Sequence, residues 1–143
     1  MNIHRSPKEG ITRADIRALI APFYDRVRAN PDIGPVFENR IGVSDSVWAE
    51  HLDKIEDFWA NVMLHDRAYQ GNPMQVHMAM PELRERHFQV WLDLFQATAR
   101  EVLPQRKADL FDQLARRIGQ SLWVGMNRVR GNDVPNLAFG DMK

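Results

Sequence analysis

Cysteine is absent from this chain of 143 residues, and its absence narrows the chemistry that the protein can perform. Without thiols the chain can form no disulfide, no thiolate zinc site, no iron–sulfur cluster and no cysteine nucleophile. Histidine, carboxylate, methionine and tyrosine side chains remain as possible metal ligands.

An excess of charge of either sign is also missing, because 19 Lys and Arg residues balance 19 Asp and Glu residues. A neutral chain offers no broad cationic field for nucleic acid or anionic lipid. No apolar run approaches the roughly 18 residues of a membrane span. The polar start MNIHRSPKEG lacks the apolar core of a secretory signal. We therefore expect a soluble, cytoplasmic protein with no nucleic-acid or membrane partner.

Strand signals are scarce as well, whereas apolar residues recur throughout at spacings of three and four. This pattern predicts an all-α fold. The length favours a single domain, since domains most often run to about 100–150 residues. We expect one domain over residues 1–143, in which residues 1–11 and 131–143 form loosely ordered ends.

Helix caps and apolar stripes place the predicted helices in the first half of the chain. Thr12 is expected to cap a helix that Pro22 kinks or divides. Residues 33–41 are too few for more than a turn or two and predict a corner. Ser44 is expected to cap a long helix. The inward stripe of that long helix contains Trp48, His51, Leu52, Ile55, Phe58, Trp59, Val62 and Met63.

Three further helices follow from the second half of the chain. Asn72 and Pro73 begin a short helix that carries His77 and stops at Pro81. The next predicted helix covers about 82–102 and the last about 107–129. The inward residues expected on these two are Phe88, Trp91, Leu92, Phe95, Val102, Leu110, Phe111, Leu114, Ile118 and Leu122.

The segment from Ala68 to Pro81 contains no Asp, Glu, Lys or Arg, in a chain of which 27% is charged. It is rich in methionine, a side chain suited to filling irregular apolar space. The composition favours a helix that lies against something large and apolar. The alternative is that His77 is an ordinary half-buried histidine among core methionines.

His51 strengthens the first interpretation, because a titratable ring on an apolar stripe needs a hydrogen-bond partner, a metal or a cavity. His51 and His77 lie on different helices and lack the i, i+3 or i, i+4 spacing of two ligands on one helix face. A two-histidine zinc site is therefore a poor fit. Two facing histidines with an apolar gap between them suit a flat iron macrocycle better.

Tyr24 and Trp91 also fall on inward stripes, and each brings a polar donor that needs a partner when buried. Both can be plain core residues that donate to backbone carbonyls. Together with His51 they instead form a cluster of donors suited to a small polar ligand such as dioxygen.

Four blocks in this order resemble the group III truncated haemoglobins, bacterial globins with a two-over-two helical sandwich around a haem. The blocks are FYDRVRANPDIGPVF, IGVSDSVWAEHLDKIEDFW, YQGNPMQVHMAM and HFQVWLDLF, and the resemblance covers about residues 12–130. The paired-glycine motifs of the other groups are absent. That absence agrees with the third group, and Phe37 stands where the second group has tyrosine.

The resemblance implies haem b as cofactor, with His77 as the proximal iron ligand and metal-binding residue. It implies that Tyr24, His51 and Trp91 surround the bound gas on the distal side, and that Trp59 obstructs the ligand tunnel of other truncated globins. The implied haem-contacting residues are Phe23, Phe37, Lys54, Ile55, Phe58, His77 and Trp91. Lys54 is the first choice for a propionate partner, followed by Arg84 or Arg86, although Lys54 also suits a solvated surface.

The function implied by the resemblance is the binding of dioxygen and other diatomic gases such as CO and NO, with oxygen transport as one use. His51 is expected to gate entry. Whether the chain is an enzyme stays open: nitric oxide dioxygenation or peroxidase-like reduction would need an external reductase. We expect a monomer or weak dimer, and no functional role for His4, His65 or His87. The alternative is a haem-free helical interaction or sensor module.

Overall fold

The computed structural model describes residues 10–64, residue 77 and residues 80–131, and the helices in those ranges include five of eight or more residues. These helices are α1 (Arg13–Ala29), α2 (Gly34–Ile41), α3 (Asp45–Leu64), α5 (Glu85–Val102) and α6 (Gln105–Val129). No strand occurs among the described residues, which confirms the all-α prediction. No helix in the same ranges is both long and apolar enough to span a membrane.

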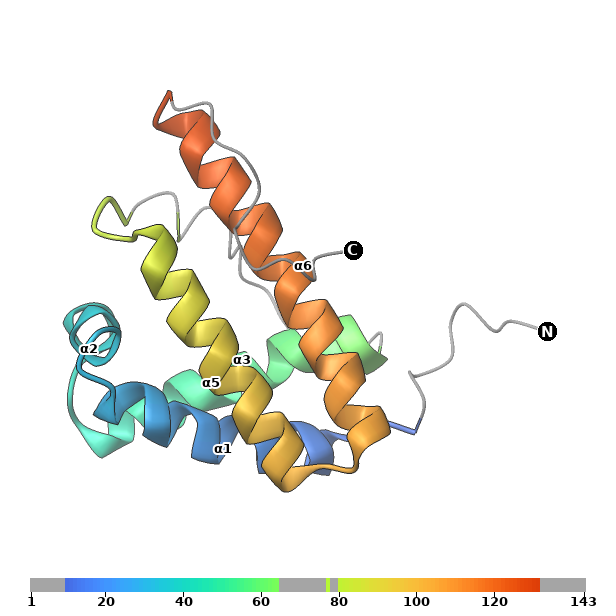
Figure 1. The fold of residues 1–143 in the computed structure, drawn as a ribbon. Coiled ribbons are helices and arrows are strands. Elements are labelled where there is room, and N and C mark those ends of the chain that lie inside the picture. The colour runs from blue at the N-terminus through green and yellow to red at the C-terminus, as the bar shows by residue number, and fades with distance from the viewer. Residues whose placement is uncertain (1–9, 65–76, 78–79, 132–143) are drawn as a thin grey trace.

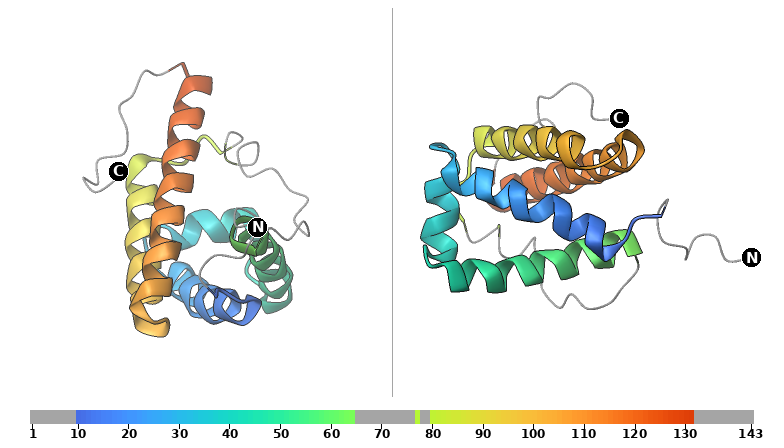
Figure 2. Two further views of the ribbon diagram at one scale, coloured as in Figure 1. Left: turned by 90° about the vertical axis from the view of Figure 1, so that its right-hand side faces the viewer. Right: turned by 90° about the horizontal axis from the view of Figure 1, so that it is seen from below.

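The helices form two crossed layers (Figure 1). Helices α1 and α3 run antiparallel in one layer, and α5 and α6 form an antiparallel hairpin in the other (Figure 2). The short helix α2 turns the chain between α1 and α3, as the predicted corner requires. The two-over-two sandwich expected from the sequence is therefore confirmed.

Helix α1 begins with the predicted cap. The Thr12 hydroxyl accepts a hydrogen bond from the Asp15 N–H at 3.1 Å, and the Asp15 carboxylate accepts one from the Thr12 N–H at 2.9 Å. The helix continues through Pro22, so the predicted joint does not occur. Buried residues on both sides of Pro22 hold the helix together despite the missing N–H. Ile11, which we placed in the loose N-terminal end, is buried in the core.

The start of α3 and the ends of α5 and α6 agree with prediction, whereas the starts of α5 and α6 differ from it by three and two residues. The Ser44 hydroxyl accepts from the Val47 N–H at 3.2 Å and caps α3 as expected. Helix α5 begins at Glu85, later than predicted, because a turn joins the Leu83 N–H to the Met80 carbonyl. Helix α6 begins at Gln105, directly after Pro104. The inward prediction for Val102 is wrong: Val102 is 37% exposed.

Trp59 links α3 to the other layer through aromatic contacts. Its ring stacks on Phe95 with centroids 5.4 Å apart and meets Phe111 at 5.5 Å. Phe95 in turn stacks on Trp91 and meets Phe23 edge to face, at 5.1 Å in each case. This continuous set of aromatic rings fixes the separation of the two layers, since such side chains pack at interior density.

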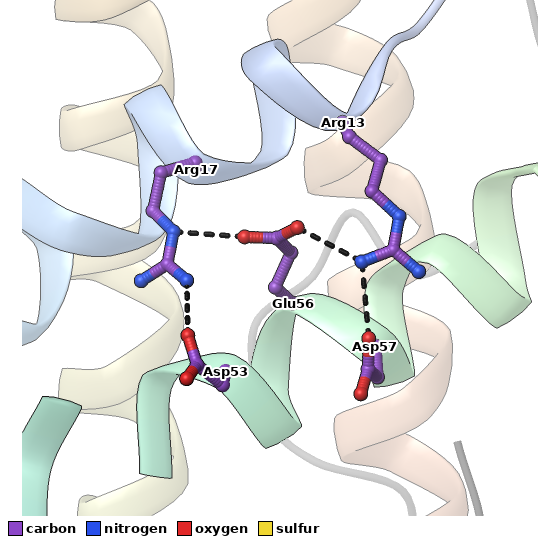
Figure 3. Close-up of polar contacts among 5 residues, drawn as sticks. All are labelled: Arg13, Arg17, Asp53, Glu56 and Asp57. Carbon is purple, nitrogen blue, oxygen red and sulfur yellow. Dashed lines mark hydrogen bonds and ion pairs between the residues drawn. The ribbon is translucent and has the colours of Figure 1, made fainter. Parts of the chain in front are cut away.

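An ionic cluster fixes α3 against α1 (Figure 3). The Glu56 carboxylate bridges the guanidinium groups of Arg13 and Arg17, at 2.8 Å from each. Asp57 adds a second contact to Arg13 at 3.0 Å, and Asp53 adds one to Arg17. Because α1 carries Tyr24 and α3 carries His51, this cluster sets how the two helices of the candidate site face each other.

Candidate functional site

Tyr24 and Trp91 form a hydrogen-bonded pair between α1 and α5. Tyr24 is only 6% exposed, and this burial raises the pKa of its hydroxyl far above the usual range; the hydrogen bond with Trp91 opposes that shift. Tyr24 therefore keeps its proton at neutral pH. An indole N–H can only donate, so Trp91 donates to the Tyr24 oxygen and leaves the phenolic proton to another acceptor.

Aromatic rings surround this donor pair. The Phe23 ring packs edge to face against the rings of Tyr24 and Trp91, with centroids 4.6 Å and 5.1 Å apart. Phe37 on α2 lies 5.9 Å from Tyr24. Phe23 itself is fully buried, so it supports the pair from within the core. Two polar groups are thus held in apolar surroundings, where a hydrogen bond is stronger than in water.

His51 lies one turn beyond Trp48 on α3 and is half-buried. Its ring meets Trp48 edge to face at 5.7 Å, and Trp48 lies 6.1 Å from Tyr24. Burial lowers the pKa of His51, and the positive charge of Lys54 lowers it further. The ring is therefore neutral at pH 7. Ring contacts thus connect His51 through Trp48 to Tyr24, which interacts in turn with Trp91.

Large apolar side chains beside this region are only partly covered by protein. The backbone of α3 packs closely on α1 and α2 but not on α5 or α6, within the described ranges. The half-buried apolar residues of α2, α3 and α5 include Phe37, Leu52, Ile55, Phe58, Trp91 and Leu94. An incompletely covered apolar surface next to buried donors fits a flat apolar macrocycle that binds a small polar ligand.

His77 is helical and half-buried. Its carbonyl accepts from the Met80 N–H at 3.0 Å, and the Met80 carbonyl accepts from Arg130 after α6 at 3.1 Å. The backbone after His77 is thus tied to the end of α6. Most of the uncharged segment, with the predicted helix start at Asn72 and Pro73, lies outside the described residues.

The candidate propionate partners occupy different settings. Lys54 is exposed, and it lies close enough to His51 to affect the pKa of that ring. Arg84 and Arg86 are exposed too, and Arg84 donates to the Pro81 carbonyl at 3.3 Å. Lys54 is thus the one of the three whose charge lowers the pKa of a distal residue, His51.

Two residues near the site were missed by the sequence analysis. Trp48, which we assigned to packing, contacts Tyr24, Phe37 and His51. Its position three residues before His51, on the same helix face, was the available signal. Arg28 stacks over the Trp48 ring at 4.8 Å. Nothing local in the sequence distinguishes Arg28 from the neighbouring arginines.

Comparison with known proteins agrees with this description, although no family model matches the chain. The group 3 truncated hemoglobin of Campylobacter jejuni subsp. jejuni is 36% identical over 110 residues, which are 77% of this chain and 87% of the relative. The crystal structure of group III truncated hemoglobin from Campylobacter jejuni superposes with a TM-score of 0.78 at 33% identity. That match covers 86% of this chain and 94% of the other.

The crossed helical layers and the enclosed donors define a globin. More particularly, the chain belongs to the group III truncated haemoglobins, the family that its sequence resembles. Membership of this family implies a haem cofactor, and the partly covered apolar residues described above are compatible with one.

Proposed function

We propose that this chain binds haem b through His77 and uses it to bind dioxygen and other diatomic gases, among them CO and NO. The observation that carries the proposal is the Tyr24–Trp91 pair, in which a buried hydroxyl and the indole N–H of a half-buried tryptophan interact among aromatic rings. When bound, the haem would supply a ferrous iron that binds the gas, and His77 would be the protein ligand that holds it and tunes its reactivity.

The distal residues act on the outer atom of the gas. Tyr24 stays protonated and donates a hydrogen bond to partial negative charge, and Trp91 orients the Tyr24 hydroxyl. Neutral His51, on the half-buried face of α3, controls entry. Phe37, Ile55 and Phe58 offer apolar contact to the macrocycle. Lys54 pairs with a propionate, with Arg84 and Arg86 as the alternatives.

The same donors favour redox chemistry on an oxygen ligand, either nitric oxide dioxygenation or peroxide reduction. Donors aimed at developing negative charge on oxygen stabilise the transition state of both reactions. Either reaction takes electrons from a separate reductase. Consumption of NO or peroxide by the reduced protein, with a chemical reductant in place of the reductase, would support this part of the proposal.

Absorption spectra of the haem-supplemented protein test the central claim. We expect an intense Soret band and a CO complex typical of histidine ligation. His77→Ala should lose or alter both, whereas His4→Ala, a histidine without a predicted role, should retain them. A folded chain that takes up no stoichiometric haem would favour the haem-free interaction or sensor module instead.

Oligomeric state and location complete the proposal. We propose a monomer or weak dimer in the cytoplasm. Sedimentation at several concentrations tests the first statement, and fractionation of cells that express the chain tests the second.

A further inference from the structure

Trp48 is the shared neighbour of three candidate site residues from three helices. The centroid of its ring lies 5.7 Å from that of His51 on α3, 6.1 Å from that of Tyr24 on α1 and 6.4 Å from that of Phe37 on α2. It is 3% exposed. A rigid bicyclic ring in this position transmits any displacement to all three neighbours, because interiors are close-packed.

Two contacts hold the Trp48 ring from outside the site. Its indole N–H donates to the Gly42 carbonyl at 2.8 Å. Gly42 has φ +118°, a backbone conformation that L side chains rarely adopt, so the direction of this carbonyl depends on glycine. The Arg28 guanidinium lies 4.8 Å from the ring centroid, within the range of a cation–π contact.

Arg28 is itself held by the junction of α2 and α3. It donates to the Val43 carbonyl at 3.0 Å and pairs with Glu38 at 3.4 Å and Asp45 at 3.8 Å. The guanidinium is therefore a fixed part of this junction, with its side chain 24% exposed. Contacts thus run from the α2–α3 junction through Arg28 to Trp48, and from Trp48 to the site.

His51 is the neighbour most dependent on Trp48. It makes no hydrogen bond to another described residue. Among the described residues, its ring contacts the ring of Trp48 edge to face. Tyr24, in contrast, is also held by Trp91 and Phe23. Loss of the Trp48 contact should therefore free His51 first.

We propose that Trp48, held by Arg28 and the Gly42 carbonyl, is a positioning residue that keeps the His51 ring in its half-buried place and so regulates gas entry. The inference deepens the proposed function and rests on it for the role of His51. Changes at the α2–α3 junction should then alter gas entry, because the contacts of Arg28 and Gly42 with Trp48 connect the junction to His51.

The first test compares Arg28→Gln with Arg26→Gln. Both arginines lie in the last turn of α1, but Arg26 contacts Thr98 and Glu101 on α5. In the haem-loaded protein, Arg28→Gln should speed CO association roughly two- to fivefold, which corresponds to the loss of one partly exposed cation–π contact. It should also raise the pKa of His51, measured by NMR of its ring protons. Arg26→Gln should leave both values unchanged.

The second test asks whether Trp48 acts through His51. Trp48→Leu should speed CO association in the wild-type background but not in His51→Ala, because the group being positioned is then absent. Trp48→Phe keeps a ring and should fall between wild type and Trp48→Leu. Equal effects of Trp48→Leu in the two backgrounds, or no effect of Arg28→Gln on either measurement, would overturn the proposal.

A failure of the proposed gas-binding function can be distinguished from a failure of the positioning role. If the wild-type chain takes up no haem, NMR titration of the protein as purified still reports the pKa of His51 in wild type and Arg28→Gln. A raised pKa in Arg28→Gln would then support positioning by Trp48 while the gas-binding role is abandoned. Equal pKa values would overturn the positioning as well.

Discussion

The indole N–H of Trp91 on α5 donates a hydrogen bond to the hydroxyl oxygen of Tyr24 on α1. Phe23 packs edge to face against both rings, at 5.1 Å and 4.6 Å. The sequence indicates two separate donors, whereas the structure couples them into one unit. Coupling leaves the Tyr24 proton available and restricts where it points.

Tyr24→Phe should speed dioxygen dissociation about ten- to hundredfold, because it removes one charge-assisted hydrogen bond of roughly 1.5–3 kcal/mol. Stopped-flow displacement of dioxygen by CO measures the rate. The phenylalanine keeps the ring contacts with Phe23 and Phe37, so packing is preserved. An unchanged dissociation rate would remove Tyr24 from this role.

Trp91→Phe should also speed dissociation, but its effect and that of Tyr24→Phe should not add in the double variant. Residues in one hydrogen-bond network commonly show coupling energies of about 0.5–3 kcal/mol. Trp123→Phe provides the matched control, because Trp123 is a buried tryptophan that contacts Phe88 at 5.6 Å. Strictly additive effects at Tyr24 and Trp91 would contradict the coupling.

CO association should accelerate as the pH falls below 6.5. This value is the ordinary pKa of histidine, and burial lowers the pKa of His51 below it. The neutral ring remains half-buried above its lowered pKa, whereas the protonated ring favours solvent because desolvation of its charge is costly. His51→Ala should associate faster at every pH and lose this dependence. Flash photolysis gives the rates; equal rates in His51→Ala and wild type would rule out a gate.

Acid should destabilise the protein through His87, which accepts from the Arg84 N–H at 2.9 Å through Nδ1. Burial lowers the pKa of His87; Arg86 and Arg84 lower it further, while Asp32 and Glu82 oppose them. Below pH 6.5 the unfolded state therefore binds more protons than the folded state, and the free energy of unfolding falls as the pH drops.

His87→Gln should be less sensitive to acid, because a glutamine at this position of the helix can still accept from the N-cap N–H but carries no charge. His87→Ala should lower the free energy of unfolding by about 1 kcal/mol at neutral pH, because it removes the hydrogen bond that caps α5. Denaturant unfolding between neutral pH and about pH 5 compares the three proteins. Identical pH dependence in wild type and His87→Gln would exclude His87 as the source.

Glu56→Gln should lower the free energy of unfolding by about 1 kcal/mol, since the two arginines it bridges are partly exposed and screened by solvent. Glu50→Gln, an exposed change on the same helix, should cost less than about 0.5 kcal/mol. High salt should shrink the difference between the two variants. Equal losses at Glu50 and Glu56 would show that the cluster contributes nothing measurable.

Individual residues show how far prediction from the sequence reached. Thr12 and Ser44 cap the helices expected of them, because capping depends on residues three positions apart. The start of α5 was missed, since the turn at Met80 and Leu83 and the cap by His87 have no strong local pattern. Val102 fits the apolar period of α5, yet it lies after the last buried residue of that helix.

The amino-acid sequence by itself determined the all-α class, most helix boundaries and the membership of a globin family, since periodicity, caps and motif order are local properties of the chain. Only the tertiary structure decided which donors meet. The hydrogen bond between Tyr24 and Trp91 and the contact of Arg28 with Trp48 join residues on different helices or far along the chain. Such contacts depend on how whole helices pack, which no short window of sequence encodes.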